Sequence, residues 1–156
     1  MNIEYILDTI RRNGFSPELV DTYHNGTRTI KFKRGPLIYR VDPTSPPFLR
    51  ISTGCQMSHE TDDINLLHQA ANEVNDSVCA GKVVVFDYSP IVCFNHETLC
   101  DSNSYFKENF ELFMKIIDTT IDKFLEIYDI LKDKDKKIQE EFTRALEPKG
   151  QDELPF

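Results

Sequence analysis

The stretch TRTIKFKRGPLIYRV, residues 27–41, decides the fold class that this sequence predicts. Its apolar side chains alternate with polar ones, so Ile30 and Phe32 share one face of an expected strand. After an Arg-Gly turn the alternation resumes, and Tyr39 and Val41 share a face of the next strand. Such strands are typical of an antiparallel sheet with one solvated face.

Sequence patterns on both sides of this stretch predict further strands and three helices, and so an α+β fold. Asn25-Gly26 predicts a hairpin turn before it, and the proline-rich segment 42–47 connects it to the next strand. The runs at 82–87 and 91–94 are apolar on both faces, so we expect them at the sheet centre or covered on each side. The expected elements are a helix over residues 3–13, a weak strand near residues 19–20, strands over 27–33, 37–41 and 48–53, a helix capped by Asp62 or Asp63, the two apolar strands, and a long helix.

We therefore predict an α+β fold in which an antiparallel sheet of about five strands is packed by three helices. These are an N-terminal helix, a middle helix and a long C-terminal helix. The predicted order is helix, three or four strands, helix, two strands, helix.

The long helix is the clearest predicted element. From Phe106 to Leu131, apolar residues recur every three or four positions, which predicts a stripe that faces the core. Beyond the lysine-rich segment 132–137, three more apolar residues keep the same phase along the helix. They are Ile138, Phe142 and Leu146.

The length of this helix raises a question about its end. An unbroken helix from Ser102 to Leu146 would be about 67 Å long, whereas a compact chain of this size has a diameter of roughly 40 Å. We predict one domain over residues 1–131, then a charged amphipathic or disordered tail over residues 132–156. Two alternatives stay open: the helix bends or frays in the lysine-rich segment, or its last turns lie on another chain.

Composition narrows the class of protein. The 156 residues include 18 Lys and Arg against 26 Asp and Glu, a net charge of −8, which makes nucleic acid an unfavourable partner. The 40% of hydrophobic residues, with 11 Phe and 6 Tyr, favour a packed core over disorder. The chain lacks a signal-peptide pattern and an apolar run long enough for a membrane span, so we expect a cytoplasmic location with reduced thiols.

The sequence holds no recognisable catalytic or cofactor motif. The glycines stand apart, whereas phosphate-binding loops need several close together. The best metal-ligand spacing is Cys93, His96 and Cys100, with Cys55 and His59 as possible additions, but strand alternation directs Cys93 and His96 to opposite faces. We therefore expect no enzyme activity, no catalytic residue, no cofactor and no metal.

One surface is predicted to be basic within this acidic chain. Residues 27–50 carry six Lys and Arg and one Asp, a local charge of +5. Arginine beside outward apolar residues favours a protein interface, although a merely solvated face is the alternative. The candidate protein-binding residues are Lys31, Lys33, Ile38, Arg40, Phe48 and Arg50 on the sheet, with Ile138, Phe142 and Leu146 on the helix.

Three short motifs support a resemblance to a known family. They are Phe48-Leu49-Arg50-Ile51-Ser52, then Ala70-Ala71-Asn72-Glu73-Val74-Asn75 at the end of the middle helix, and Gly81-Lys82-Val83 at the start of the next strand. Together with the element order, they make residues 3–131 resemble the bacterial YbjN-type domain, whose fold is similar to that of type III secretion chaperones. The resemblance implies a cytoplasmic, non-enzymatic module that dimerises or holds another protein, and it implies no catalytic residue.

We therefore predict a chaperone-like or adaptor-like protein-binding module that forms a homodimer and binds another, unidentified protein. One alternative is a small-ligand-binding or enzymatic domain, with a site between sheet and helices that holds His59, His68 or His96. A further alternative is a nucleic-acid-binding regulator that uses the basic strand face.

Overall fold

The computed structural model describes residues 2–21, 28–45, 47–57, 63–87 and 91–146 of the chain. Three helices and six strands make up the fold. They are α1 (Ile3–Arg12), β1 (Glu18–Asp21), β2 (Arg28–Arg34), β3 (Leu37–Ser45), β4 (Phe48–Gln56), α2 (Ile64–Ser77), β5 (Gly81–Phe86), β6 (Ile91–Leu99) and α3 (Asn103–Leu146). The predicted α+β class and element order are confirmed, and the weak strand pairs with β2 as the sixth strand.

The six strands form one antiparallel sheet in the order β1-β2-β3-β4-β6-β5. The expectation for residues 82–87 is wrong, because β5 is an edge strand with Val84 39% exposed while Val83 is buried. Its run of valines reflects the preference of β-branched residues for a pleated strand rather than burial on both faces. β6 lies inside the sheet, and only one of its faces is buried.

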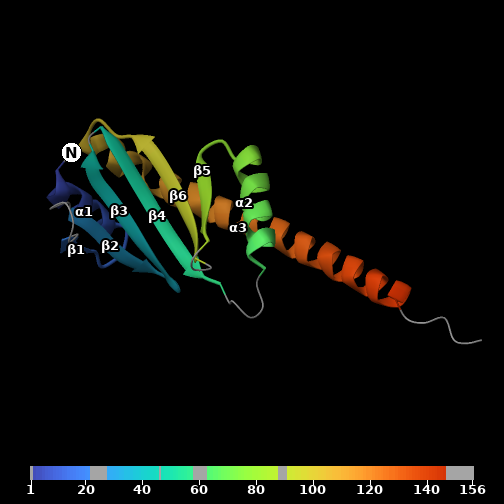
Figure 1. Cartoon of the computed structure of the whole chain (residues 1–156). Helices are drawn as coiled ribbons and strands as arrows, with labels where there is room; N and C mark the ends of the chain where they lie inside the picture. The colour runs from blue at the N-terminus through green and yellow to red at the C-terminus, as the bar shows by residue number, and fades with distance from the viewer. Residues whose placement is uncertain (1, 22–27, 46, 58–62, 88–90, 147–156) are drawn as a thin grey trace, which may run out of the picture.

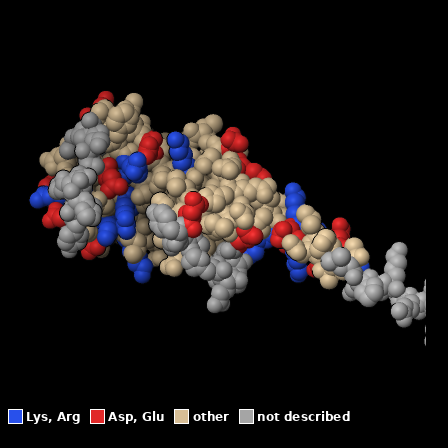
Figure 2. Space-filling model, in the orientation of Figure 1, with Lys and Arg blue, Asp and Glu red and all other residues tan. Residues whose placement is uncertain are grey.

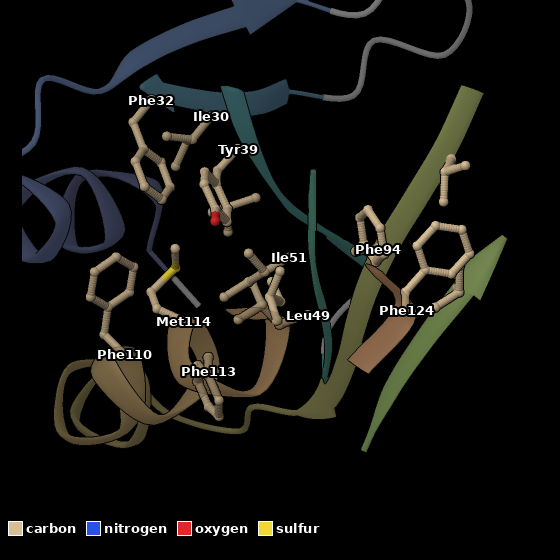
Figure 3. Packing of buried hydrophobic residues seen from close by; sticks show 14 of the residues in the cluster. Ile30, Phe32, Tyr39, Leu49, Ile51, Phe94, Phe110, Phe113, Met114 and Phe124 are labelled. Atoms are coloured by element: carbon tan, nitrogen blue, oxygen red, sulfur yellow. The ribbon is translucent and has the colours of Figure 1, made fainter. Parts of the chain in front are cut away.

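The helices cover one face of the sheet and leave the other open (Figure 1). α3 runs behind the strands, while α2 packs against β5 and α3. In the core, rings from the strands meet rings from α3, and Phe94 contacts Phe124 edge to face with centroids 5.5 Å apart (Figure 3). The apolar stripe predicted from Phe106 to Leu131 is buried.

Capping side chains fix the N-terminal ends of α1 and α2. Asn2 caps α1 by accepting a hydrogen bond from the Glu4 N–H, and Asp63 caps α2 in the same way through the Asn65 N–H. Each cap satisfies a backbone donor that would otherwise have no partner within its helix. The turn predicted at Asn25-Gly26 lies outside the described residues.

The open side of the edge strand β5 is closed by a side chain from α2. The Asn75 amide donates to the Val83 carbonyl oxygen at 2.9 Å and accepts from the Val83 N–H at 2.8 Å. It therefore takes the place of one residue of a neighbouring strand. Nearby, Gly81 contacts α3 so closely that an added Cβ would collide with Thr120 Oγ1. Two of the motifs behind the family resemblance thus meet each other and hold the sheet edge to the helices.

α3 is one helix of 44 residues, about 66 Å long. It continues without a break through residues 132–137, so the helix does not end or fray in this segment, as one of the two alternatives had it. The helix leaves the rest of the fold beyond Leu131, which is 7% exposed, and projects away from the sheet (Figure 1). On the projecting part, Ile138 and Phe142 are 63% and 62% exposed.

Candidate protein-binding surfaces

The open face of the sheet carries the six residues that the sequence singled out on strands. Lys31, Lys33, Ile38, Arg40, Phe48 and Arg50 all lie on this face, because each alternates with a buried neighbour on its strand. The structure therefore brings together residues that are separated by up to nineteen positions in the sequence.

Strand register arranges part of the open face as a row of polar side chains, three of which are basic. Lys31 lies opposite Arg40, which lies opposite Ser52, and the row continues through Asn95 to Lys82. We call these five residues the basic row. It holds three cations across five adjacent strands, with two uncharged polar side chains at its centre.

Sequence reasoning missed Lys82, although it lies on the same face as Arg40. Its alternation with the buried Val83 was the available signal for an outward direction. The sequence carries no local sign that β5 joins the sheet beside β6, so the row could not be assembled from it.

Apolar side chains lie beside the basic row. Ile38 is 57% exposed and lies opposite Lys33, while Cys93 lies between Gly54 and Val84 on the neighbouring strands. Burial raises the pKa of the Cys93 thiol, and the nearby Arg40 charge opposes that rise. This part of the open face therefore has apolar side chains between Lys33 and the edge strand β5, next to the basic row.

A second apolar pair lies at the other end of the sheet. Phe48 and Leu99 are opposite each other in the register and are 58% and 60% exposed. Leu99 was not among the predicted residues, since only the pairing of β4 with β6 brings it beside Phe48.

Three of the six basic residues counted between positions 27 and 50 form ion pairs within the molecule. Arg50 pairs with Glu97 at 2.6 Å, and Arg28 lies 3.5 Å from Asp21. Arg34 pairs with Asp118 of α3 at 2.6 Å. Within the described part of the chain, no ion pair engages Lys31, Lys33 or Arg40, so these three side chains have no internal counter-ion there. Lysine and arginine atoms gather over β3 and its neighbours on the visible face (Figure 2).

Arg34 belongs to a small polar network between the sheet and α3. Its guanidinium donates to Asp118 and, at 3.5 Å, to the Tyr39 hydroxyl, which itself donates to Asp118 at 3.3 Å. The hydrogen bond to Asp118 raises the pKa of the Arg34 guanidinium. Burial raises the pKa of the Tyr39 phenol. The network fixes the β2–β3 hairpin to α3 and has a structural role.

The helix residues in the prediction form a separate surface. Ile138 and Phe142 are exposed on the projecting part of α3, and Leu146 is its last residue, whose side chain lies outside the described part. Figure 1 shows this part of α3 extending away from the open face. The structure thus divides the predicted residues between two surfaces.

Of the histidines of the ligand-site alternative, the two that the structure describes, His68 and His96, are not brought together. His68 pairs with Asp87 at 2.6 Å near the surface, and His59 lies outside the described residues. His96 is buried against Phe113, with Nδ1 3.0 Å from the Ala80 carbonyl oxygen and Nε2 without a partner among the described atoms. An open hollow of about 530 Å³ lies elsewhere, at the N-terminus of α3, lined by Asn2, Asp101, Ser102 and Asn103.

The cysteine and histidine residues weighed as metal ligands also diverge. Cys93 lies on the open face, whereas His96 points into the core from the same strand. Cys100 is buried, and its thiol donates to the Ser102 carbonyl oxygen at 3.5 Å. Within the described ranges, no three His, Cys, Asp or Glu side chains gather closely enough to hold a metal ion.

These features define a class of fold: a six-stranded antiparallel sheet with one open face, covered on the other by helices that include a long C-terminal one. A solved protein with this fold is YbjN from E. coli, described as a candidate transcription regulator. The match has a TM-score of 0.55 at 10% sequence identity and covers 78% of this chain and 89% of that chain. The predicted YbjN-like fold is confirmed.

Sequence comparison adds no further relative. No family model matches the chain, and no curated protein matches it significantly. In the described part of the chain, none of the helices is long and apolar enough to cross a membrane.

Proposed function

We propose that this protein is a non-catalytic protein-binding module, chaperone-like or adaptor-like, that acts in the cytoplasm as a homodimer. In this proposal residues 1–131 form the domain and residues 132–156 an extension. The observation that carries it is the open sheet face, where exposed Ile38 lies opposite Lys33 and next to the register pair of Lys31 and Arg40.

The chemistry of this face indicates the kind of partner. Apolar side chains contribute affinity when a partner removes them from water, and cations without an internal ion pair attract and orient an acidic partner. A partner segment with acidic residues next to apolar ones would satisfy both features. We therefore expect the second protein to present an acidic, partly apolar surface.

The separation of titratable groups supports a non-catalytic function. General acid–base and nucleophilic catalysis need such groups within hydrogen-bond reach of one another and of a common reacting atom. His68 instead lies on α2 and pairs with Asp87, whereas His96 lies on β6 with its ring in the core and contacts the Ala80 carbonyl oxygen.

Charge reversal on the basic row tests the binding proposal. We expect the full chain to capture its partner from a native extract and the K31E/R40E variant to lose most of that capture. A matched control, K107E/K115E, makes the same charge change on exposed positions of α3 and should retain capture. Equal capture by K31E/R40E and the unmodified protein would rule out the open face as the binding surface.

Nucleic-acid binding is a second candidate, favoured by the basic row and by the description of YbjN. The net charge of −8 opposes it. Binding to DNA or RNA would have to weaken steeply with added salt, because phosphate contacts release counterions. Binding that survives K31E/R40E would exclude the basic row as the nucleic-acid surface.

A further inference from the structure

The part of α3 beyond the domain, residues 132–146, keeps an apolar stripe that nothing in the described chain covers. Leu131 is buried, and Ile138 and Phe142 follow it at spacings of seven and four residues on the same side of the helix. The stripe is therefore a continuation of the core-facing stripe into solvent. We call residues 132–146 the α3 extension.

Charge is distributed unevenly along the α3 extension. Its first part, residues 132–137, holds four lysines and two aspartates, a net charge of +2. Its second part, residues 138–146, holds two glutamates and one arginine, a net charge of −1. The projecting helix in Figure 2 accordingly shows charged atoms of both signs beside uncharged surface.

This polarity makes the extension complementary to a reversed copy of itself. In an antiparallel pair centred on Ile138, Lys136 in the lysine-rich part of one helix lies opposite Glu140 of the other. In a parallel pair, lysines would lie beside lysines and glutamates beside glutamates. Exposed ion pairs are individually weak, so the charges select the orientation while Ile138 and Phe142 supply the apolar contact.

Asp135 lies on the stripe between Leu131 and Ile138, at the spacing of a coiled-coil seam position. A charged residue in a seam weakens the pairing and limits the registers that the two helices can adopt. The extension is also only four turns long, so its dimer should be weak and dependent on concentration.

We propose that two copies of this protein pair through the α3 extension in antiparallel orientation, with Ile138 and Phe142 at the contact. This inference rests on the proposed homodimer and specifies where and how the copies meet. The two domains then lie at opposite ends of the paired helices, and both open sheet faces stay accessible to a partner.

Sedimentation equilibrium of the full chain tests the orientation. In an antiparallel dimer, E140K/E141K places lysines beside lysines, and we expect the dimer dissociation constant to rise about tenfold. The fourfold variant K136E/K137E/E140K/E141K exchanges both halves and should restore the original value. The control E108K/E111K, at exposed positions on the part of α3 beneath the sheet, should leave the constant unchanged.

A distance measurement provides a second, independent readout. A spin label at K132C, in a background that carries C79S because Cys79 is exposed, reports the separation of the two Lys132 positions. Antiparallel pairing over the extension separates them by about 20 Å or more, whereas parallel pairing leaves them about 10 Å apart.

The possible outcomes distinguish a failure of the antiparallel pairing from a failure of the proposed homodimer. A monomer at every concentration overturns both. A dimer that tolerates E140K/E141K and shows the short label distance overturns the antiparallel pairing and leaves the homodimer standing. A dimer whose dissociation constant is unchanged by I138S/F142S overturns the assignment of the contact to the extension.

Discussion

At the scale of single residues, two side chains connect different elements of the fold by hydrogen bonds. Asn75 completes the edge of β5, and Tyr39 joins the sheet to Asp118 of α3. Neither contact is visible in the sequence, because Asn75 and Val83 lie on different elements and Tyr39 and Asp118 are 79 positions apart. The polar–apolar alternation, by contrast, correctly predicts that Tyr39 faces the core.

Replacing Asn75 by alanine should lower the free energy of unfolding by about 1–3 kcal/mol, because the change leaves the N–H and carbonyl of Val83 without partners. Chemical denaturation followed by circular dichroism measures the loss. Asn72→Ala is the matched control, since Asn72 is exposed on the same helix. A loss of similar size at both positions would contradict the assigned role of Asn75.

Stability should also fall at alkaline pH through Tyr39. Its folded-state pKa is raised above the ordinary value of 10.0, so the native state holds the phenolic proton more tightly than the unfolded chain does. The free energy of unfolding is then unaffected by this group below about pH 10 and decreases as the pH rises above it.

Tyr39→Phe should therefore flatten the alkaline decrease in unfolding free energy, besides removing a hydrogen bond worth about 1 kcal/mol. Denaturation curves recorded on both sides of pH 10 check this result. Tyr105→Phe, on the exposed side of α3, should leave the alkaline slope as it is in the unmodified protein. An unchanged slope in Tyr39→Phe would show that another group causes the decrease.

At the scale of elements, the apolar stripe of α3 lies in the core along one part of the helix and in solvent along the other. The same stripe is buried from Phe106 to Leu131 and exposed at Ile138 and Phe142. The sequence correctly predicts the phase of the stripe and the burial of its first part. It leaves open whether the helix continues, because periodicity alone does not show where the sheet and α2 stop covering it.

Phe124 and Phe142 make this contrast measurable, since they are five helical turns apart and lie on the same side of α3. Phe124→Ala should lower the free energy of unfolding by about 3–5 kcal/mol, because the ring is fully buried against Phe94. Phe142→Ala should change it by less than about 0.5 kcal/mol at protein concentrations too low for association. Comparable losses in the two variants would contradict the exposure of the extension.

At the scale of the whole molecule, a net charge of −8 conceals a basic sheet face and a helix extension with separated charges. Folding changes which basic side chains remain without an internal ion pair. Arg28, Arg34 and Arg50 are engaged by acidic residues from other elements, whereas Lys82 joins Lys31 and Arg40 from a distant strand. The set of cations without an internal ion pair is therefore smaller and differently composed than the run of charges in the sequence suggests.

The sequence by itself determined what depends on local periodicity. Alternation on β2, β3 and β4 set the two faces of the sheet, and the spacing along α3 set the stripe that enters the core. The element order followed from these patterns, and together with three short motifs it carried the resemblance to the YbjN-type domain.

Only the tertiary structure decided which distant residues meet. The edge position of β5, the composition of the basic row, the Asn75–Val83 closure and the length of α3 left uncovered all depend on register and packing between elements far apart in the chain. Periodicity specifies the direction of each side chain relative to its own element. The partners in space are selected by the summed packing of the whole core, which no local pattern contains.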